Sequence, residues 1–191
     1  MYKYIRSVLA RRTFAHKLRN KAMNTFSSYE IFKSIREKQE QNRQTEKRPH
    51  EVFYFHKVDD PYSHLTVQYL DKLKDSYDIV LKSILVGEEN PEALHEPSLY
   101  NKYCLEDVRR IANYYQIDFT ADSYPSKNLV DLANSILSSV EKENFNNIAR
   151  DVSSALWNND EEKLKEISTK YSSSEEEVNK KLFEGNKIRN E

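Results

Sequence analysis

The sequence contains a single cysteine, Cys104, in 191 residues. One thiol excludes an internal disulfide, a Cys-x-x-Cys redox pair and a multi-cysteine zinc site. This scarcity is typical of a reducing compartment, and we expect a cytoplasmic location. Because Cys104 stands among apolar and aromatic residues in a helical pattern, we interpret it as a small core residue rather than a nucleophile.

Glycine and long apolar runs are also scarce. Gly87 and Gly185 are the only two glycines, which excludes a glycine-rich phosphate loop and indicates helices joined by polar turns rather than hairpins. The longest apolar runs, such as residues 52–55 and 79–81, fall far short of the roughly 20 residues that a membrane-spanning helix needs. We therefore predict no transmembrane segment.

Metal-ligand patterns are missing as well. The histidines do not have metal-ligand spacing, and no cluster of cysteine and carboxylate residues accompanies them. We expect no metal site, and we interpret these histidines as surface or turn residues: His50, His56, His64 and His95.

Acidic residues are absent from the first 28 positions, so charge is unevenly distributed. Residues 1–50 carry 13 Lys and Arg against 4 Glu, a net charge of +9, whereas the remainder carries 17 against 27, a net charge of −10. The two parts of the chain should therefore have different partners or complement one another.

Residues 1–36 form a basic arm in which apolar residues recur at roughly helical spacing: Ile5, Val8, Leu9, Phe14 and Leu18. Such an arm can pack on its own domain, contact an anionic membrane, bind nucleic acid or serve as a transit peptide, in which case the location would be the mitochondrial matrix. We do not expect nucleic acid as a partner, because no recognised nucleic-acid-binding fold accompanies the arm. Residues 37–51 are almost wholly polar and are interpreted as a linker.

The next segment predicts a β-α-β unit. Residues 52–57 and 79–85 are short runs that are apolar on both alternating faces, as expected of parallel strands covered on two sides. Between them, Asp60 is a favourable helix N-cap and Pro61 suits the first helical position. The following amides, on Tyr62, Ser63 and His64, would point out of a positive helix end that stabilises anions and thiolates.

The remainder of the chain is predicted to be helical. Apolar residues recur at helical spacing in five segments, 98–119, 129–140, 145–157, 164–171 and 178–188. Capping-box patterns, Asn159-x-x-Glu162 and Ser174-x-x-Glu177, open the last two. We expect these helices to pack as one bundle.

Residues 53–65, Phe-Tyr-Phe-His-Lys-Val-Asp-Asp-Pro-Tyr-Ser-His-Leu, resemble the active-site strand and turn of kappa-class glutathione transferases, 2-hydroxychromene-2-carboxylate isomerases and DsbA-like oxidoreductases. Weaker resemblance continues through residues 105–108, 115–119, 149–157 and 174–183, which are similar to the helical insertion of that family. The resemblance implies a thioredoxin-like α/β fold of the DsbA and kappa-transferase type over residues 52–191, with strand-helix-strand at 52–86 and a helical insertion at 98–190.

The resemblance also implies a site at the turn. Where the family has a serine that holds the glutathione thiolate, or a reactive cysteine, this chain has Asp60. A carboxylate there would occupy the anion position and repel a thiolate. Ser63 corresponds to the second serine or resolving cysteine, and together with Asp60 it is the candidate for catalysis. The candidate ligand-binding residues are Pro61, Tyr62, His64, Tyr100 and Lys102. Tyr100 falls where the kappa class has a lysine that contacts glutathione, and Lys102 stands two residues further on, which is a second departure from the family pattern.

The chain lacks the later cis-proline, the β-hairpin and the final helix of a complete thioredoxin fold, since Pro125 is its last proline. Two parallel strands alone would have open edges. We therefore expect another domain or chain, including a second copy of this one, to complete the sheet.

Two functional hypotheses remain open. The first is a glutathione-dependent isomerase or transferase that acts on a small thiol or aromatic molecule, with glutathione as its cofactor. The second is a catalytically inactive thioredoxin-fold module that binds a partner. Dithiol-disulfide exchange is excluded, because Cys104 stands alone.

Overall fold

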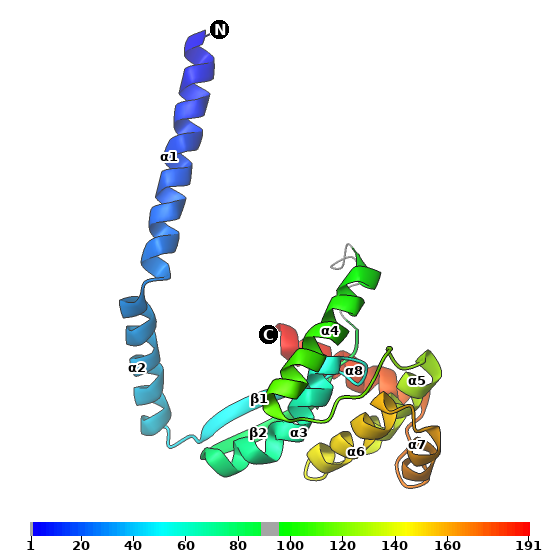
Figure 1. Cartoon of the computed structure of the whole chain (residues 1–191). Helices are drawn as coiled ribbons and strands as arrows, with labels where there is room; N and C mark the ends of the chain where they lie inside the picture. Colours follow the sequence, from blue (N-terminus) through cyan, green and yellow to red (C-terminus); the bar gives the residue numbers. More distant parts are fainter. Residues whose placement is uncertain (1, 89–95) are drawn as a thin grey trace. The chain divides into compact units, whose positions relative to one another are not determined.

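The computed structural model describes residues 2–88 and 96–191, so His95 lies outside the described residues. The chain divides into two units, Met1–His50 and Glu51–Glu191. It is 67% helical with a small two-stranded parallel sheet, as expected of a mostly helical α/β protein. Figure 1 shows the order of the elements along the chain.

The first unit consists of two helices, α1 (Tyr2–Phe26) and α2 (Tyr29–Thr45). Residues 37–45, interpreted above as part of a linker, are helical instead. Glu, Gln, Lys and Arg are good helix formers, and Glu40 accepts hydrogen bonds from Arg43 at 2.6 Å and Gln44 at 2.8 Å. These hydrogen bonds, with that from Arg43 the stronger, lower the pKa of Glu40 to about 2.

The second unit begins with the predicted β-α-β arrangement. Strand β1 (His50–His56) leads into helix α3 (Pro61–Ser76) and then into strand β2 (Ile79–Leu85), which pairs with β1 in parallel. One face of the sheet is buried through Tyr54 and Leu85, whereas the other leaves Phe53 and Val80 largely exposed. The prediction that the strands are covered on both sides was therefore wrong for the face that carries Phe53 and Val80.

Five further helices follow, in the region predicted to be helical. They are α4 (Pro97–Tyr115), α5 (Lys127–Ser139), α6 (Phe145–Trp157), α7 (Glu161–Ser168) and α8 (Glu175–Asn190). Helix α5 contacts α6, α7 and α8, and α6 also contacts α3. The main core joins these helices to the sheet through buried side chains that include Val67, Leu85, Ile136, Leu137, Val152 and Leu156.

The N-cap predicted for helix α8 is confirmed, whereas the N-cap predicted for α7 is not. Ser174 and Glu177 form the predicted capping box of α8. For α7 the prediction was wrong, because Asp160 rather than Asn159 is the N-cap and accepts a hydrogen bond from the Lys163 amide at 2.9 Å. Asn159 instead adopts a left-handed conformation, φ 56°, just after the end of α6, a conformation that asparagine tolerates better than most residues.

None of the helices in the described ranges has the length and apolar composition required to cross a membrane.

Gly185 brings α8 into very close contact with β2. A Cβ atom at this position would overlap the carbonyl oxygen of Leu85. Two hydrogen bonds flank the contact, one from the Gly87 amide to Asn186 Oδ1 at 3.1 Å and one from Asn186 Nδ2 to the Glu88 carbonyl at 3.5 Å. Glycine is therefore required at position 185 by space rather than by backbone conformation.

We expect Gly185→Ala to destabilise the chain by about 2 kcal/mol, because α8 must move away from β2. This loss should exceed the roughly 1 kcal/mol that alanine gains over glycine inside a helix. Urea denaturation measures both variants against the parent chain. Gly87→Ala is the matched control, since a Cβ there would lie an ordinary 3.4 Å from Leu182. A Gly185→Ala variant as stable as the parent would contradict the close contact.

Candidate functional site

The turn between β1 and α3 is closed by hydrogen bonds of its own residues. Asp60 is the N-cap of α3, and its Oδ2 accepts hydrogen bonds from the Ser63 amide and the Ser63 hydroxyl, each at 2.7 Å. Ser63 Oγ also accepts a hydrogen bond from the Lys57 amide at 3.3 Å. Pro61 occupies the first turn of the helix and is buried. The predicted cap and the predicted helix start are both confirmed.

The hydrogen bonds of Ser63 determine which groups at this turn could contact a ligand. Ser63 is only 6% exposed, and both of its hydrogen-bond donors are directed at Asp60. In a thiol site these donors would be directed at the thiolate. Here both donors are directed at Asp60 Oδ2.

A buried polar chain lies beneath the turn. The Tyr54 hydroxyl donates a hydrogen bond to the Ser63 carbonyl at 2.9 Å and lies 2.7 Å from His56 Nδ1. A phenol has one proton, so the second contact requires that His56 Nδ1 carry a proton and donate it to Tyr54. His56 Nε2 is then free to accept a hydrogen bond from Ser153 Oγ, 3.4 Å away on α6. The chain thus links β1, α3 and α6.

His56 and His64 are buried, 0% and 4% exposed, so the expectation that they are surface or turn residues was wrong. Burial lowers the pKa of His56 to about 3, with a smaller contribution from His64 nearby. Burial likewise lowers the pKa of His64 to about 4. Both side chains are therefore neutral at physiological pH.

His64 belongs to an aromatic cluster. Its ring stacks on Trp157, with centroids 6.1 Å apart, and also lies 5.9 Å from Phe119. The amide of Gln68 lies 3.3 Å from His64 Nε2 and donates to the Asp118 carbonyl at 3.0 Å. His64 Nδ1 is buried and has no hydrogen-bond partner among the described residues. His64 therefore helps to pack α3 against α6.

Two tyrosines and the cysteine lie beside the turn. Tyr62 donates a hydrogen bond to Asp107 Oδ2 on α4 at 2.8 Å. Burial, followed by this hydrogen bond, raises the pKa of Tyr62. Burial also raises the pKa of Tyr124, with smaller contributions from Cys104 and Asp60 nearby. Cys104 itself is buried, as predicted for a core residue.

Of the two residues proposed on α4, the structure brings Tyr100 toward this region and not Lys102. Tyr100 acts electrostatically on Tyr124. Side chains two positions apart on a helix point to different faces, and Lys102 is exposed. The ligand-binding roles predicted for Tyr100 and Lys102 stay predictions.

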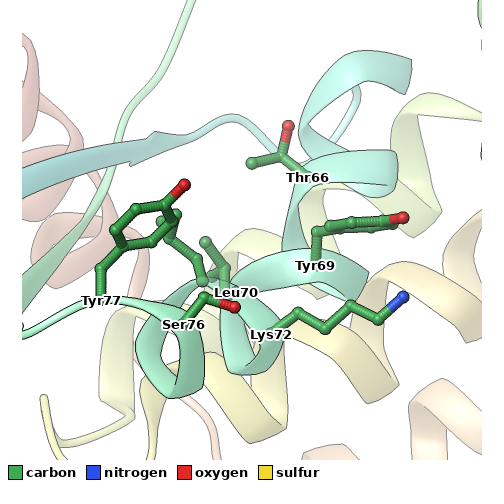
Figure 2. A pocket seen from close by; sticks show the side chains of 7 residues that line it. Thr66, Tyr69, Leu70, Lys72, Ser76 and Tyr77 are labelled. Atoms are coloured by element: carbon green, nitrogen blue, oxygen red, sulfur yellow. The ribbon is translucent and has the colours of Figure 1, made fainter.

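Two hollows lie near these residues, and neither was predicted from the sequence. One, of about 540 Å³, lies between α3, α6 and the segment after α4, and its lining residues are His64, Gln68, Asp118, Thr120, Arg150, Asp151, Ser154, Trp157 and Asn158. The other, of about 380 Å³, is a mainly apolar groove along α3 that ends at Tyr77. Figure 2 shows the side chains of Tyr69, Leu70 and Tyr77 that line this groove.

The described residues contain no group of three or more His, Cys, Asp and Glu side chains placed to hold a metal ion.

No family model, no curated protein and no solved structure matches this chain. The resemblance of residues 53–65 to the transferase and isomerase family therefore stays a prediction.

The two buried histidines make stability dependent on pH. In the unfolded chain a histidine has a pKa of about 6.5, whereas the folded values are about 3 for His56 and about 4 for His64. The unfolded state therefore binds more protons as the pH falls below about 6.5. We expect the free energy of unfolding to fall between pH 6.5 and 4 by about 1.4 kcal/mol per pH unit for each histidine.

Urea denaturation at several pH values checks this slope. In a His64→Gln variant this slope should be smaller by about 1.4 kcal/mol per pH unit, the contribution of one histidine. His16→Gln, at an exposed position on α1, is the control for the loss of one histidine from the chain. Equal slopes for His64→Gln and the parent would contradict the assignment of His64 as a buried neutral group.

Proposed function

We propose that the Glu51–Glu191 unit is a thioredoxin-like module of the DsbA and kappa-transferase type that binds a partner polypeptide and does not carry out thiol chemistry. The observation that supports this most directly is the pair of hydrogen bonds from Ser63 to Asp60 Oδ2, both at 2.7 Å. They give the helix N-terminus an internal anion.

A glutathione-dependent isomerase or transferase would need those same donors for the glutathione thiolate. To bind there, the thiolate would have to displace a carboxylate that is covalently part of the chain and held by two short hydrogen bonds. Two like charges a few ångströms apart also repel each other. The geometry of the turn therefore favours the binding module over the enzyme.

The partner would complete the sheet. No further strand pairs with β1 or β2 in the described ranges. The His56 carbonyl accepts a hydrogen bond from the Val86 amide, beside β2, and alternate residues of a strand direct their backbone groups to opposite sides. The backbone groups of Phe53 and Phe55 therefore point toward the open edge, where an added strand could bind them.

The exposed face of the sheet is consistent with a partner as well. Phe53 and Phe55 stack with centroids 6.4 Å apart, and Lys82 Nζ lies 5.3 Å from the Phe53 ring while it pairs with Glu51 at 2.5 Å. Aromatic residues beside an unpaired edge are suited to cover by a segment that adds a strand there. Such a segment could belong to another domain, another protein or a second copy of this chain.

Replacing Asp60 tests the absence of thiol binding. Asp60→Ser removes the charge, keeps a helix cap and restores a hydroxyl donor, so the free energy of unfolding should change by less than about 1 kcal/mol. Calorimetric titration with glutathione should detect weak or no binding to the parent chain and tighter binding to Asp60→Ser. Asp59→Ser, which removes a neighbouring charge without altering the cap, is the control. A parent chain that binds glutathione as well as Asp60→Ser does would contradict the proposal.

Hydrogen exchange tests the open edge. In the isolated chain, the amides of Phe53 and Phe55 should exchange much faster than those of Val52 and Tyr54, which face β2. Exchange followed by NMR resolves these four neighbouring amides within a single strand. Equal protection of all four would mean that the edge is already covered, and sedimentation would then show whether a second copy covers it.

A further inference from the structure

The described part of the first unit shows no core of its own. Among the side chains described from residue 14 to residue 50, none is buried. Helices are stabilised in water mainly by packing of an apolar face, and few isolated helices persist without it. Helices α1 and α2 have 25 and 17 residues, and over the side chains described from residue 14 onward they show no buried apolar face. A surface that covers them would therefore stabilise them.

The charge of α1 specifies the sign of that surface. Residues 2–28 contain seven Lys and Arg and no Asp or Glu. A surface that covers this helix must be anionic, because seven positive charges without a counter-charge repel one another and are drawn to negative groups. A second copy of the same helix is thereby disfavoured.

The apolar side chains of α1 distinguish a lipid surface from other anionic partners. Phe14, Leu18, Ala22 and Phe26 recur every four residues and so form one row along the helix. Phe14 is 69% exposed, Leu18 60% and Phe26 71%. Burial of such exposed, bulky apolar side chains among lipid acyl chains would be favourable, and exposed apolar patches of this kind mark interaction sites.

The cations lie along the borders of this row. At 100° per residue, Lys17 and Lys21 fall on one side of Leu18 and Ala22, and Arg19 falls on the other. Lysine and arginine at such borders can place their stems on apolar surface while their charges reach lipid headgroups. Phosphates of a nucleic acid would satisfy the cations but would leave Phe14, Leu18 and Phe26 in water.

We propose that α1 binds an anionic lipid bilayer by lying in its surface, with the row of Phe14, Leu18, Ala22 and Phe26 inserted among the acyl chains and the flanking lysines and arginine at the headgroups. A helix of this kind binds through its buried apolar area together with attraction to anionic lipid. The site is independent of the turn at Asp60 and of the open edge of β1.

Sedimentation of the full chain with vesicles tests the proposal. Vesicles of phosphatidylcholine with one-third phosphatidylserine should bind the chain, and pure phosphatidylcholine should not. Replacing Lys17, Arg19 and Lys21 by Ala should weaken binding roughly a hundredfold, at about fivefold for each charge. Replacing Lys170, Lys180 and Lys187, exposed in the second unit, removes the same charge and should have no such effect.

A second variant separates lipid from phosphate binding. Replacing Phe14, Leu18 and Phe26 by Ser should abolish vesicle binding but leave retention on a heparin column unchanged. Heparin binds proteins through its negative charges, and these substitutions do not change the charge of α1. Far-UV circular dichroism with and without vesicles shows whether each variant still forms the helix. Vesicle binding that survives these serines would overturn the proposal in favour of a purely electrostatic phosphate contact. If the parent chain does not bind anionic vesicles, the lipid proposal is overturned. Slow hydrogen exchange over residues 14–26 would then indicate that α1 docks on protein instead.

Discussion

The hydrogen bond from the Tyr54 hydroxyl to the Ser63 carbonyl is the contact on which the second unit most depends. It joins the buried face of β1 to the first turn of α3. The phenol oxygen of Tyr54 also accepts a hydrogen bond from His56 Nδ1, and His56 Nε2 accepts one from Ser153 Oγ on α6. The consecutive elements β1 and α3 are thereby joined to the distant helix α6 by buried neutral polar groups. In a buried environment each hydrogen bond is stronger than in water, and each loss leaves a partner unsatisfied.

This polar chain explains why the turn above it is fixed. The Ser63 backbone is held from below by Tyr54, while its amide and hydroxyl are held from above by Asp60. A residue whose carbonyl, amide and hydroxyl groups all have hydrogen-bond partners cannot easily reorient toward a ligand. Burial, followed by the nearby Asp60 charge, also raises the pKa of Tyr54, so the phenol remains protonated and continues to donate its hydrogen bond.

Much of the fold could be predicted because its signals are local. The two strands, the start of α3 at Pro61 and the capping box of Ser174 each depend on residues within one or two turns of one another. The polar stretch at 37–45 was misread because a solvated helix and a linker share a composition, and only the bonds of Glu40 distinguish them. At α7 two adjacent cap formers compete, and Asn159 takes the left-handed position that leaves Asp160 as the cap.

The buried polar chain beneath the candidate site was less predictable, because one of its contacts joins residues far apart in sequence. His56 and Ser153 are 97 positions apart, and nothing local to either one indicates a buried pair. The cap at Asp60 was visible in the sequence, but the use of both Ser63 donors by that cap required the geometry. The resemblance to a thiol-binding family stays a prediction, whereas the hydrogen bonds from Ser63 to Asp60 are seen in the structure itself.

The tight fit of Gly185 against Leu85 has a consequence for how the chain folds. Its flanking hydrogen bond, from Gly87 to Asn186, closes a loop of 99 residues, and such long closures carry an entropic cost that is recovered only after the intervening helices are in place. Helix α8 should therefore dock last during folding and leave first during unfolding. Detachment of α8 would remove the contact of Gly185 with Leu85 and so uncover the end of β2.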